Sequence, residues 1–204
     1  MKIVLGVTGC IAAYKAPSIV SGLLATGNEV VVVMTQNATR FIDPRCFKVK
    51  TLWGMWERES GDIPHIELAN WAEAFVVAPA TANIIGKFAN GIADDLLSTN
   101  HLALSETVVK IIYPAMNTNM LVHPAVQQNM KTLFSRGWDV QAPEFGMLQC
   151  GVEGEGKLAK ERSIVEHVNE YLKNNDPTLG SPLFGAHGRR WKETIEGCRQ
   201  TAEN

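Results

Sequence analysis

The sequence repeats one arrangement, in which a short and mostly apolar run is followed by a longer stretch with the spacing of a helix. The runs are residues 2–7, 28–35, 74–80, 107–115 and 138–143. Apolar runs of this length, without regular polar alternation, are typical of strands that are buried on both faces. Strands that alternate with helices predict a doubly wound α/β fold with a mostly parallel sheet, a Rossmann-like, flavodoxin-type three-layer sandwich. In such folds the ligand binds beyond the carboxyl ends of the strands.

The stretches between these runs predict the helices. Helical spacing of apolar residues marks 10–27, 81–104, 123–137 and 159–174. Gly91 is a weak point within the second of these stretches. For residues 39–52 we expect a helix start, a turn at Pro44 and a further helical piece. For residues 65–72 we expect a loop that leads into a short helix.

Composition bounds the domain organisation and the class of function. The chain has 204 residues, and we expect one domain over 1–175 and a flexible tail over 176–204, where proline and glycine are frequent. A net charge of -2 gives no support for a nucleic-acid partner. No apolar run approaches the roughly 20 residues that span a membrane. The cysteines form no CxxC pair, which fits a reducing cytoplasm and predicts no metal site.

The first predicted strand ends in a glycine turn, GVTGCIAAYK, that opens a helix. Backbone N–H groups at such a helix start can bind a phosphate. The full dinucleotide fingerprint is missing, and Thr35 stands at the end of the second strand where an acidic residue would hold a ribose. The turn therefore favours a phosphate over a dinucleotide, and a tight turn without a ligand is the alternative.

Two further strand ends carry small, soft or amide side chains. In APATANIIGK, Thr81 and Asn83 either cap a helix or border a flat ring that lies close to the backbone. In PAMNTNM, the methionines either fill core gaps or contact such a ring. Asn117 lies where ligands bind in this architecture, and its neutral amide can hold a carboxylate without cancelling the charge. This pattern predicts an aromatic ligand and an acidic substrate group at one edge of the sheet.

Two reactive side chains are candidates for proton transfer. His65 follows Pro64 ahead of a predicted helix and is either a base at a pocket mouth or an ordinary surface or core residue. Cys150 lies in LQCGVEGEGKLA, which predicts either a glycine-rich flap that closes over substrate or a plain hairpin. Asp94 and Asp95 are adjacent and diverge on a helix, so we do not expect them to act as a catalytic carboxylate pair.

These segments, together with HIELANWA and APATANIIGKFANGIADDLL, resemble the flavin-containing cysteine decarboxylase family from Met1 to about residue 173. The resemblance implies bound FMN close to a subunit interface in a homo-oligomer, a trimer or a dodecamer. It implies decarboxylation of 4'-phosphopantothenoylcysteine to 4'-phosphopantetheine in coenzyme A biosynthesis. One alternative is a peptidyl-cysteine decarboxylase that acts on a C-terminal cysteine, and another is a flavin-binding regulatory subunit without turnover.

The resemblance also implies roles for individual residues. The cofactor-binding set is Gly9, Cys10, Thr35, Phe41, Thr81, Ala82, Asn83, Ile84 and Met120. The substrate-binding set is Ala115, Met116, Asn117 and Gly151, and the catalytic residues are His65 and Cys150. In the implied reaction, the thiol is oxidised to a thioaldehyde with FMN as hydride acceptor, carbon dioxide leaves, and Cys150 protonates the enethiolate before hydride returns. The sequence departs from the family at Cys10, where Gly or Ser is common.

Overall fold

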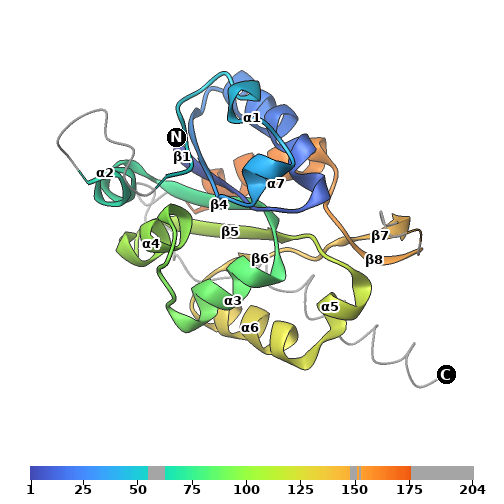
Figure 1. The fold of residues 1–204 in the computed structure, drawn as a ribbon. Helices are drawn as coiled ribbons and strands as arrows, with labels where there is room; N and C mark the ends of the chain where they lie inside the picture. The colour runs from blue at the N-terminus through green and yellow to red at the C-terminus, as the bar shows by residue number, and fades with distance from the viewer. Residues whose placement is uncertain (55–62, 148–150, 152, 176–204) are drawn as a thin grey trace.

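The computed structural model describes residues 1–54, 63–147, 151 and 153–175 (Figure 1). Within these ranges, the main sheet consists of β1 (Lys2–Val7), β2 (Glu29–Met34), β3 (Thr51–Leu52), β4 (Ala74–Ala80), β5 (Val109–Pro114) and β6 (Asp139–Val140). The helices are α1 (Ala16–Ala25), α2 (Pro64–Trp71), α3 (Ala82–Asn90), α4 (Leu96–Ala103), α5 (Thr118–Val122), α6 (Pro124–Ser135) and α7 (Glu161–Asn174). Short 3-10 helices span η1 (Ile11–Lys15), η2 (Ala38–Arg40) and η3 (Pro44–Cys46).

The strand order is β3-β2-β1-β4-β5-β6, and every neighbouring pair is parallel. This order confirms the predicted doubly wound sheet. The chain leaves β1 toward one side of the sheet and β4 toward the other, so the switch point lies between these two strands. Ligands of such folds bind beyond the carboxyl ends of the strands at this point.

The sheet separates two helical layers, as Figure 1 shows. On one face, α1 and α7 pack on alternate strand residues such as Ala74 and Val76 of β4. On the other face, α2, α3, α4 and α6 pack on the residues between them, such as Phe75 and Val77. Every residue of β4 is buried, which explains the continuous apolar run in the sequence.

Two predicted helices are divided in the structure. The stretch 81–104 forms α3 and α4, because Gly91 ends α3 in the left-handed region at φ 68°. Asp95 then caps α4 in a reciprocal hydrogen-bond pair with Ser98. The stretch 10–27 begins as η1 and continues as α1, with Pro17 in the first turn of α1.

Two elements, β3 and α5, were not predicted. β3 lies in the stretch 39–52, for which only helical pieces and a turn were expected, and it pairs with β2 at the edge of the sheet. α5 follows β5 directly, and β7 (Glu144–Met147) and β8 (Glu153–Lys157) form an antiparallel hairpin. The glycine-rich segment therefore contains a hairpin, and its closing over substrate as a flap stays a prediction, because residues 148–150 and 152 lie outside the described residues. The predicted tail 176–204 lies outside the described residues. No helix of the described ranges is long and apolar enough to cross a membrane.

Candidate active site

Thr8 joins the ends of β1 and β4 at the switch point. Its hydroxyl donates to the carbonyl of Pro79 at 2.8 Å and accepts the N–H of Thr81 at 3.0 Å. Thr8 is only 1% exposed. These bonds hold the two strand ends together, so the hydroxyl has a structural role in positioning Thr81.

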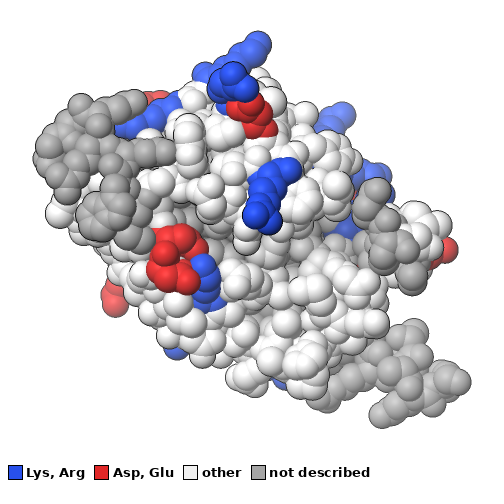
Figure 2. Space-filling model, in the orientation of Figure 1, with Lys and Arg blue, Asp and Glu red and all other residues white. Residues whose placement is uncertain are grey.

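A cavity of about 370 Å³ opens at this edge of the sheet, within the size range of small-molecule sites. It brings together part of the predicted set: Gly9, Cys10, Thr81, Ala82, Ala115, Met116, Asn117 and Met120. These residues come from the segments that follow β1, β4 and β5, including the starts of α3 and α5, and the sequence placed them at separate strand ends. In the view of Figure 2, the surface around α5 is mostly uncharged, which agrees with the mostly apolar side chains of the cavity wall.

Sequence reasoning missed other parts of the wall. Ile11 and Tyr14 of η1 are 50% and 61% exposed and line the cavity, as do Met147 and Lys157 of the hairpin. An exposed aromatic side chain on a short helix gives no local signal in the sequence. Lys157 immediately follows the GEG segment, and its position at the cavity depends on how the hairpin folds back.

Several predicted site residues lie away from this cavity. Phe41 lines a second hollow with Arg40 and Trp53. Thr35 follows β2 and donates its N–H to the carbonyl of Val7 at 3.0 Å. In α3, the side chain of Asn83 is exposed and that of Ile84 lies in the core. Gly151 is described but does not line the cavity, and Cys150 lies outside the described residues.

The turn after β1 is shaped by packing as well as by its position at the cavity. A Cβ atom on Gly9 would lie 2.6 Å from the Cβ of Asn37, so the turn needs a glycine here to approach η2. Cys10 precedes η1, and its backbone carbonyl accepts the N–H of Ala13 at 3.0 Å. Burial raises the pKa of the Cys10 thiol and outweighs the opposite effect of the backbone amides of Ala12 and Ala13. Cys10 therefore presents a neutral thiol to the cavity at neutral pH.

Asn117 caps α5 and has a fixed amide orientation. Its side-chain oxygen accepts the N–H of Asn119 at 2.9 Å. The NH₂ group of the same amide therefore points away from the helix start. Asn117 is exposed and lines the cavity, and a side-chain amide at this place suits the recognition of a carboxylate.

The hairpin is attached to the loop that follows β5. The N–H of Met116 donates to the carbonyl of Gly156 at 3.0 Å, and the hydroxyl of Thr118 donates to the carbonyl of Glu155 at 2.7 Å. A Cβ atom on Gly156 would lie 2.0 Å from the carbonyl oxygen of Met116. A Cβ atom on Gly154 would lie 2.5 Å from the Thr118 hydroxyl. The glycines of the GEG segment are thus required for the hairpin to form one wall of the cavity.

His65 lies in the first turn of α2, which begins at Pro64, and not in a loop ahead of the helix as predicted, and it does not line the cavity. Its backbone carbonyl accepts the side-chain amide of Asn100 at 2.9 Å. Its Nδ1 atom is buried and has no hydrogen-bond partner among the described residues. The structure therefore divides the predicted site between the cavity and a second surface at the start of α2.

Comparisons with known proteins match the part of the chain that forms this domain. The Flavoprotein family model matches residues 1–173. The coenzyme A biosynthesis bifunctional protein CoaBC of Bacillus subtilis is 40% identical over 191 residues, which cover 91% of this chain and 46% of that protein. This chain thus spans about half the length of such bifunctional relatives. Phosphopantothenoylcysteine decarboxylase of Mus musculus is 38% identical over 181 residues, which cover 85% of this chain and 88% of that protein.

Solved structures are similar over most of the domain. A mutant PPC decarboxylase complexed with pantothenoylaminoethenethiol has a TM-score of 0.78 and 28% identity, covering 84% of this chain and 98% of that one. The FMN-dependent cysteine decarboxylase SpaF has a TM-score of 0.71 and 29% identity, covering 83% and 96%. The fold and the cavity define a doubly wound α/β domain with a ligand site at its switch point. The matches show that the chain belongs to the Flavoprotein family.

Proposed function

We propose that this chain binds FMN and decarboxylates the cysteine carboxylate of 4'-phosphopantothenoylcysteine, giving 4'-phosphopantetheine in coenzyme A biosynthesis. The observation that carries the proposal is the position of Asn117, a residue with a neutral side-chain amide that lines a mostly apolar cavity at the switch point. The named relatives support the choice of substrate, since one that is 38% identical over 88% of its own length is a phosphopantothenoylcysteine decarboxylase. The absence of a CxxC pair supports a cytoplasmic location.

The residues of the cavity fit FMN. Met116 and Met120 offer polarizable thioethers, and Ala82 leaves room for a planar ring close to the backbone. Gly9 and Cys10 precede η1, where backbone N–H groups suit a phosphate. Bound FMN would supply a hydride acceptor that later returns the hydride, so the overall reaction needs no other oxidant or reductant.

Asn117 and His65 have different proposed tasks. The amide of Asn117 holds the substrate carboxylate as a neutral donor, so the carboxylate keeps the electron pair that it releases when carbon dioxide leaves. His65 accepts the proton of the substrate thiol, which prepares the carbon that bears sulfur for oxidation. The resulting thioaldehyde lies β to the carboxylate and accepts the electrons of decarboxylation.

The separation of His65 from the cavity supports a homo-oligomeric active site. Within one chain, the residue proposed as base lies at the start of α2, and the residue proposed to hold the carboxylate lies after β5. We propose that His65 of one subunit faces the cavity of its neighbour in a trimer, either free or within a dodecamer. A cyclic arrangement of this kind uses the same pair of surfaces at each interface.

Cys150 separates this function from its nearest alternative. A peptidyl-cysteine decarboxylase would release an enethiol, whereas 4'-phosphopantetheine requires protonation of the enethiolate and return of the hydride. We propose that Cys150, which precedes Gly154 and Gly156 in the sequence, donates that proton. The peptide substrate is the alternative, and the similarity to SpaF, a cysteine decarboxylase, does not separate the two substrates.

Cofactor release and carbon dioxide measurement test the proposal together. We expect the purified protein to be yellow and to release FMN that is identified by its mass. We expect carbon dioxide release from 4'-phosphopantothenoylcysteine, and we expect His65→Asn to keep the flavin while losing this activity. A protein that binds no FMN after reconstitution, or a fully active His65→Asn variant, contradicts the proposal.

A further inference from the structure

The contact between α2 and α4 contains two buried polar atoms without hydrogen-bond partners in the described part of the chain. They are Nδ1 of His65 and Oδ1 of Asn100. Asn100 is 0% exposed and belongs to α4. An unpaired buried polar group is costly, so such groups are rare without a function.

The orientation of the Asn100 amide is fixed by its hydrogen bond to the backbone of His65. Its nearer atom lies 2.9 Å from the backbone carbonyl of His65. A carbonyl oxygen only accepts, so this atom is the NH₂ nitrogen, and the acceptor Oδ1 is the other branch of the same amide. The imidazole of His65 can donate from Nδ1 in one of its two neutral tautomers. The same two residues therefore offer an unused acceptor and an unused potential donor.

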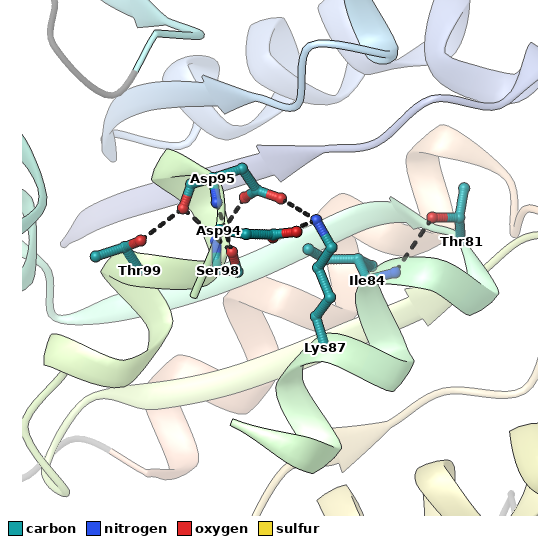
Figure 3. Close-up of polar contacts among 7 residues, drawn as sticks. All are labelled: Thr81, Ile84, Lys87, Asp94, Asp95, Ser98 and Thr99. Atoms are coloured by element: carbon teal, nitrogen blue, oxygen red, sulfur yellow. Dashed lines mark hydrogen bonds and ion pairs between the residues drawn. The ribbon is translucent and has the colours of Figure 1, made fainter. Parts of the chain in front are cut away.

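The position of α4 relative to the cavity is also fixed. Thr81 lines the cavity and caps α3, and Lys87 of α3 contacts Asp95 at 2.6 Å (Figure 3). Asp95 accepts the N–H of Ser98 at 2.8 Å and so begins α4. Side chains therefore connect the cavity wall through α3 to the helix that carries Asn100.

We propose that Asn100 is the positioning residue for His65. Its NH₂ group holds the backbone of the first turn of α2, and its Oδ1 accepts the Nδ1 proton in the competent rotamer of His65. This hydrogen bond selects the tautomer in which Nε2 is unprotonated, which is the state that can accept a thiol proton. The inference rests on the proposed function, because it assigns the base of that reaction its orientation.

Two variants of Asn100 separate the roles of its NH₂ group and its Oδ1 atom. A variant of another residue, Asn175, serves as a matched control. Asn100→Leu keeps the shape and removes both donor and acceptor, whereas Asn100→Asp keeps an acceptor. Asn175→Leu is the control, because Asn175 is also buried and also donates its amide to a helical carbonyl, that of Tyr171 at 2.8 Å. The readouts are the ¹⁵N signals of the His65 ring in the protein as purified, assigned by their loss in His65→Asn, and steady-state kinetics.

In the wild type and in Asn100→Asp, we expect neutral His65 to carry its proton on Nδ1. In Asn100→Leu, we expect the proton to move to Nε2 and kcat to fall about 10- to 100-fold, while KM changes less than about twofold. Asn175→Leu should keep the wild-type kcat. A wild-type proton on Nε2, or an Asn100→Leu variant with wild-type kcat, overturns the proposal. If the wild type releases no carbon dioxide, the proposed function fails, and the ring signals still decide whether Asn100 sets the tautomer.

Discussion

The N–H of Met116 donates to the carbonyl of Gly156 across 3.0 Å, and this backbone contact attaches the β7–β8 hairpin to the loop that carries Asn117. Both segments line the same cavity. The wall of the site therefore depends on how closely two backbones approach. This approach is possible because Gly156 has no side chain.

Gly156→Ala should detach the hairpin from the loop. Its Cβ would lie 2.0 Å from the carbonyl oxygen of Met116, and Gly156 has a φ of 135°. We expect a local cost of about 2 kcal/mol or more. Hydrogen exchange at the Met116 amide should accelerate, and KM should rise. The control is Gly86→Ala, whose Cβ would meet Asn129 at an ordinary 3.5 Å and which should stabilise α3 by about 0.5–1 kcal/mol. Unchanged exchange in Gly156→Ala contradicts the role of this contact.

Stability should fall as the pH is lowered because of His101. Its ring lies 4.4 Å from that of Phe88 and 5.3 Å from that of Trp138, and burial, with smaller contributions from Lys110 and Arg136, lowers its pKa to about 4. In the unfolded chain the imidazole of His101 has its ordinary pKa of about 6.5. Between about pH 6.5 and 4, unfolding therefore takes up a proton. We expect a loss of roughly 3 kcal/mol over this range.

His101→Phe should reduce the change in the free energy of unfolding between about pH 6.5 and 4, since the variant has no proton to take up at that position. Phe also removes the buried Nδ1 atom of His101, which has no partner among the described residues. The measurement is the free energy of unfolding by denaturant at pH 7.5 and at pH 4.5. A variant that retains the full wild-type difference between the two pH values shows that another group is responsible.

Mixing two inactive variants should restore activity if subunits share the site. His65→Asn lacks the proposed base, and Asn117→Asp places a negative charge beside the substrate carboxylate. In random mixed oligomers, about a quarter of the sites combine an intact His65 with an intact Asn117 from different subunits. We expect carbon dioxide release to recover toward this fraction after co-expression. A mixture of His65→Asn with the double variant should stay inactive, and no recovery in the first mixture contradicts a shared site.

The sequence predicted the central strands because their signal is local. Each residue of β4 is buried on one face or the other, so its apolar character is visible in seven consecutive letters. β3 has two residues and is held by backbone pairing with β2, which leaves no side-chain pattern to detect. The break between α3 and α4 was anticipated at Gly91, but the start of α4 depends on a capping box between Asp95 and Ser98.

The site was predictable where turns after strands carry unusual residues, and it was not predictable where distant segments meet. Gly9, Thr81 and Asn117 follow strands, and the parallel sheet brings them to one cavity. Asn100 looks like an ordinary polar residue of a helix. Its one signal is that it lies four residues after Leu96, on the buried side of α4. A polar residue on an apolar face indicates a buried partner, but not which one.

The most direct test of the central claim is the mass of the product formed from 4'-phosphopantothenoylcysteine without oxygen, compared between the wild type and Cys150→Ser, with a peptide that ends in cysteine as the second substrate. The account predicts 4'-phosphopantetheine from the wild type. It predicts the enethiol, with hydride retained on the cofactor, from Cys150→Ser, because a hydroxyl is a much weaker acid than a thiol of pKa about 8.5. The peptide should stay unchanged. An enethiol from the peptide, together with no product from 4'-phosphopantothenoylcysteine, would contradict the account and show that the chain modifies peptides.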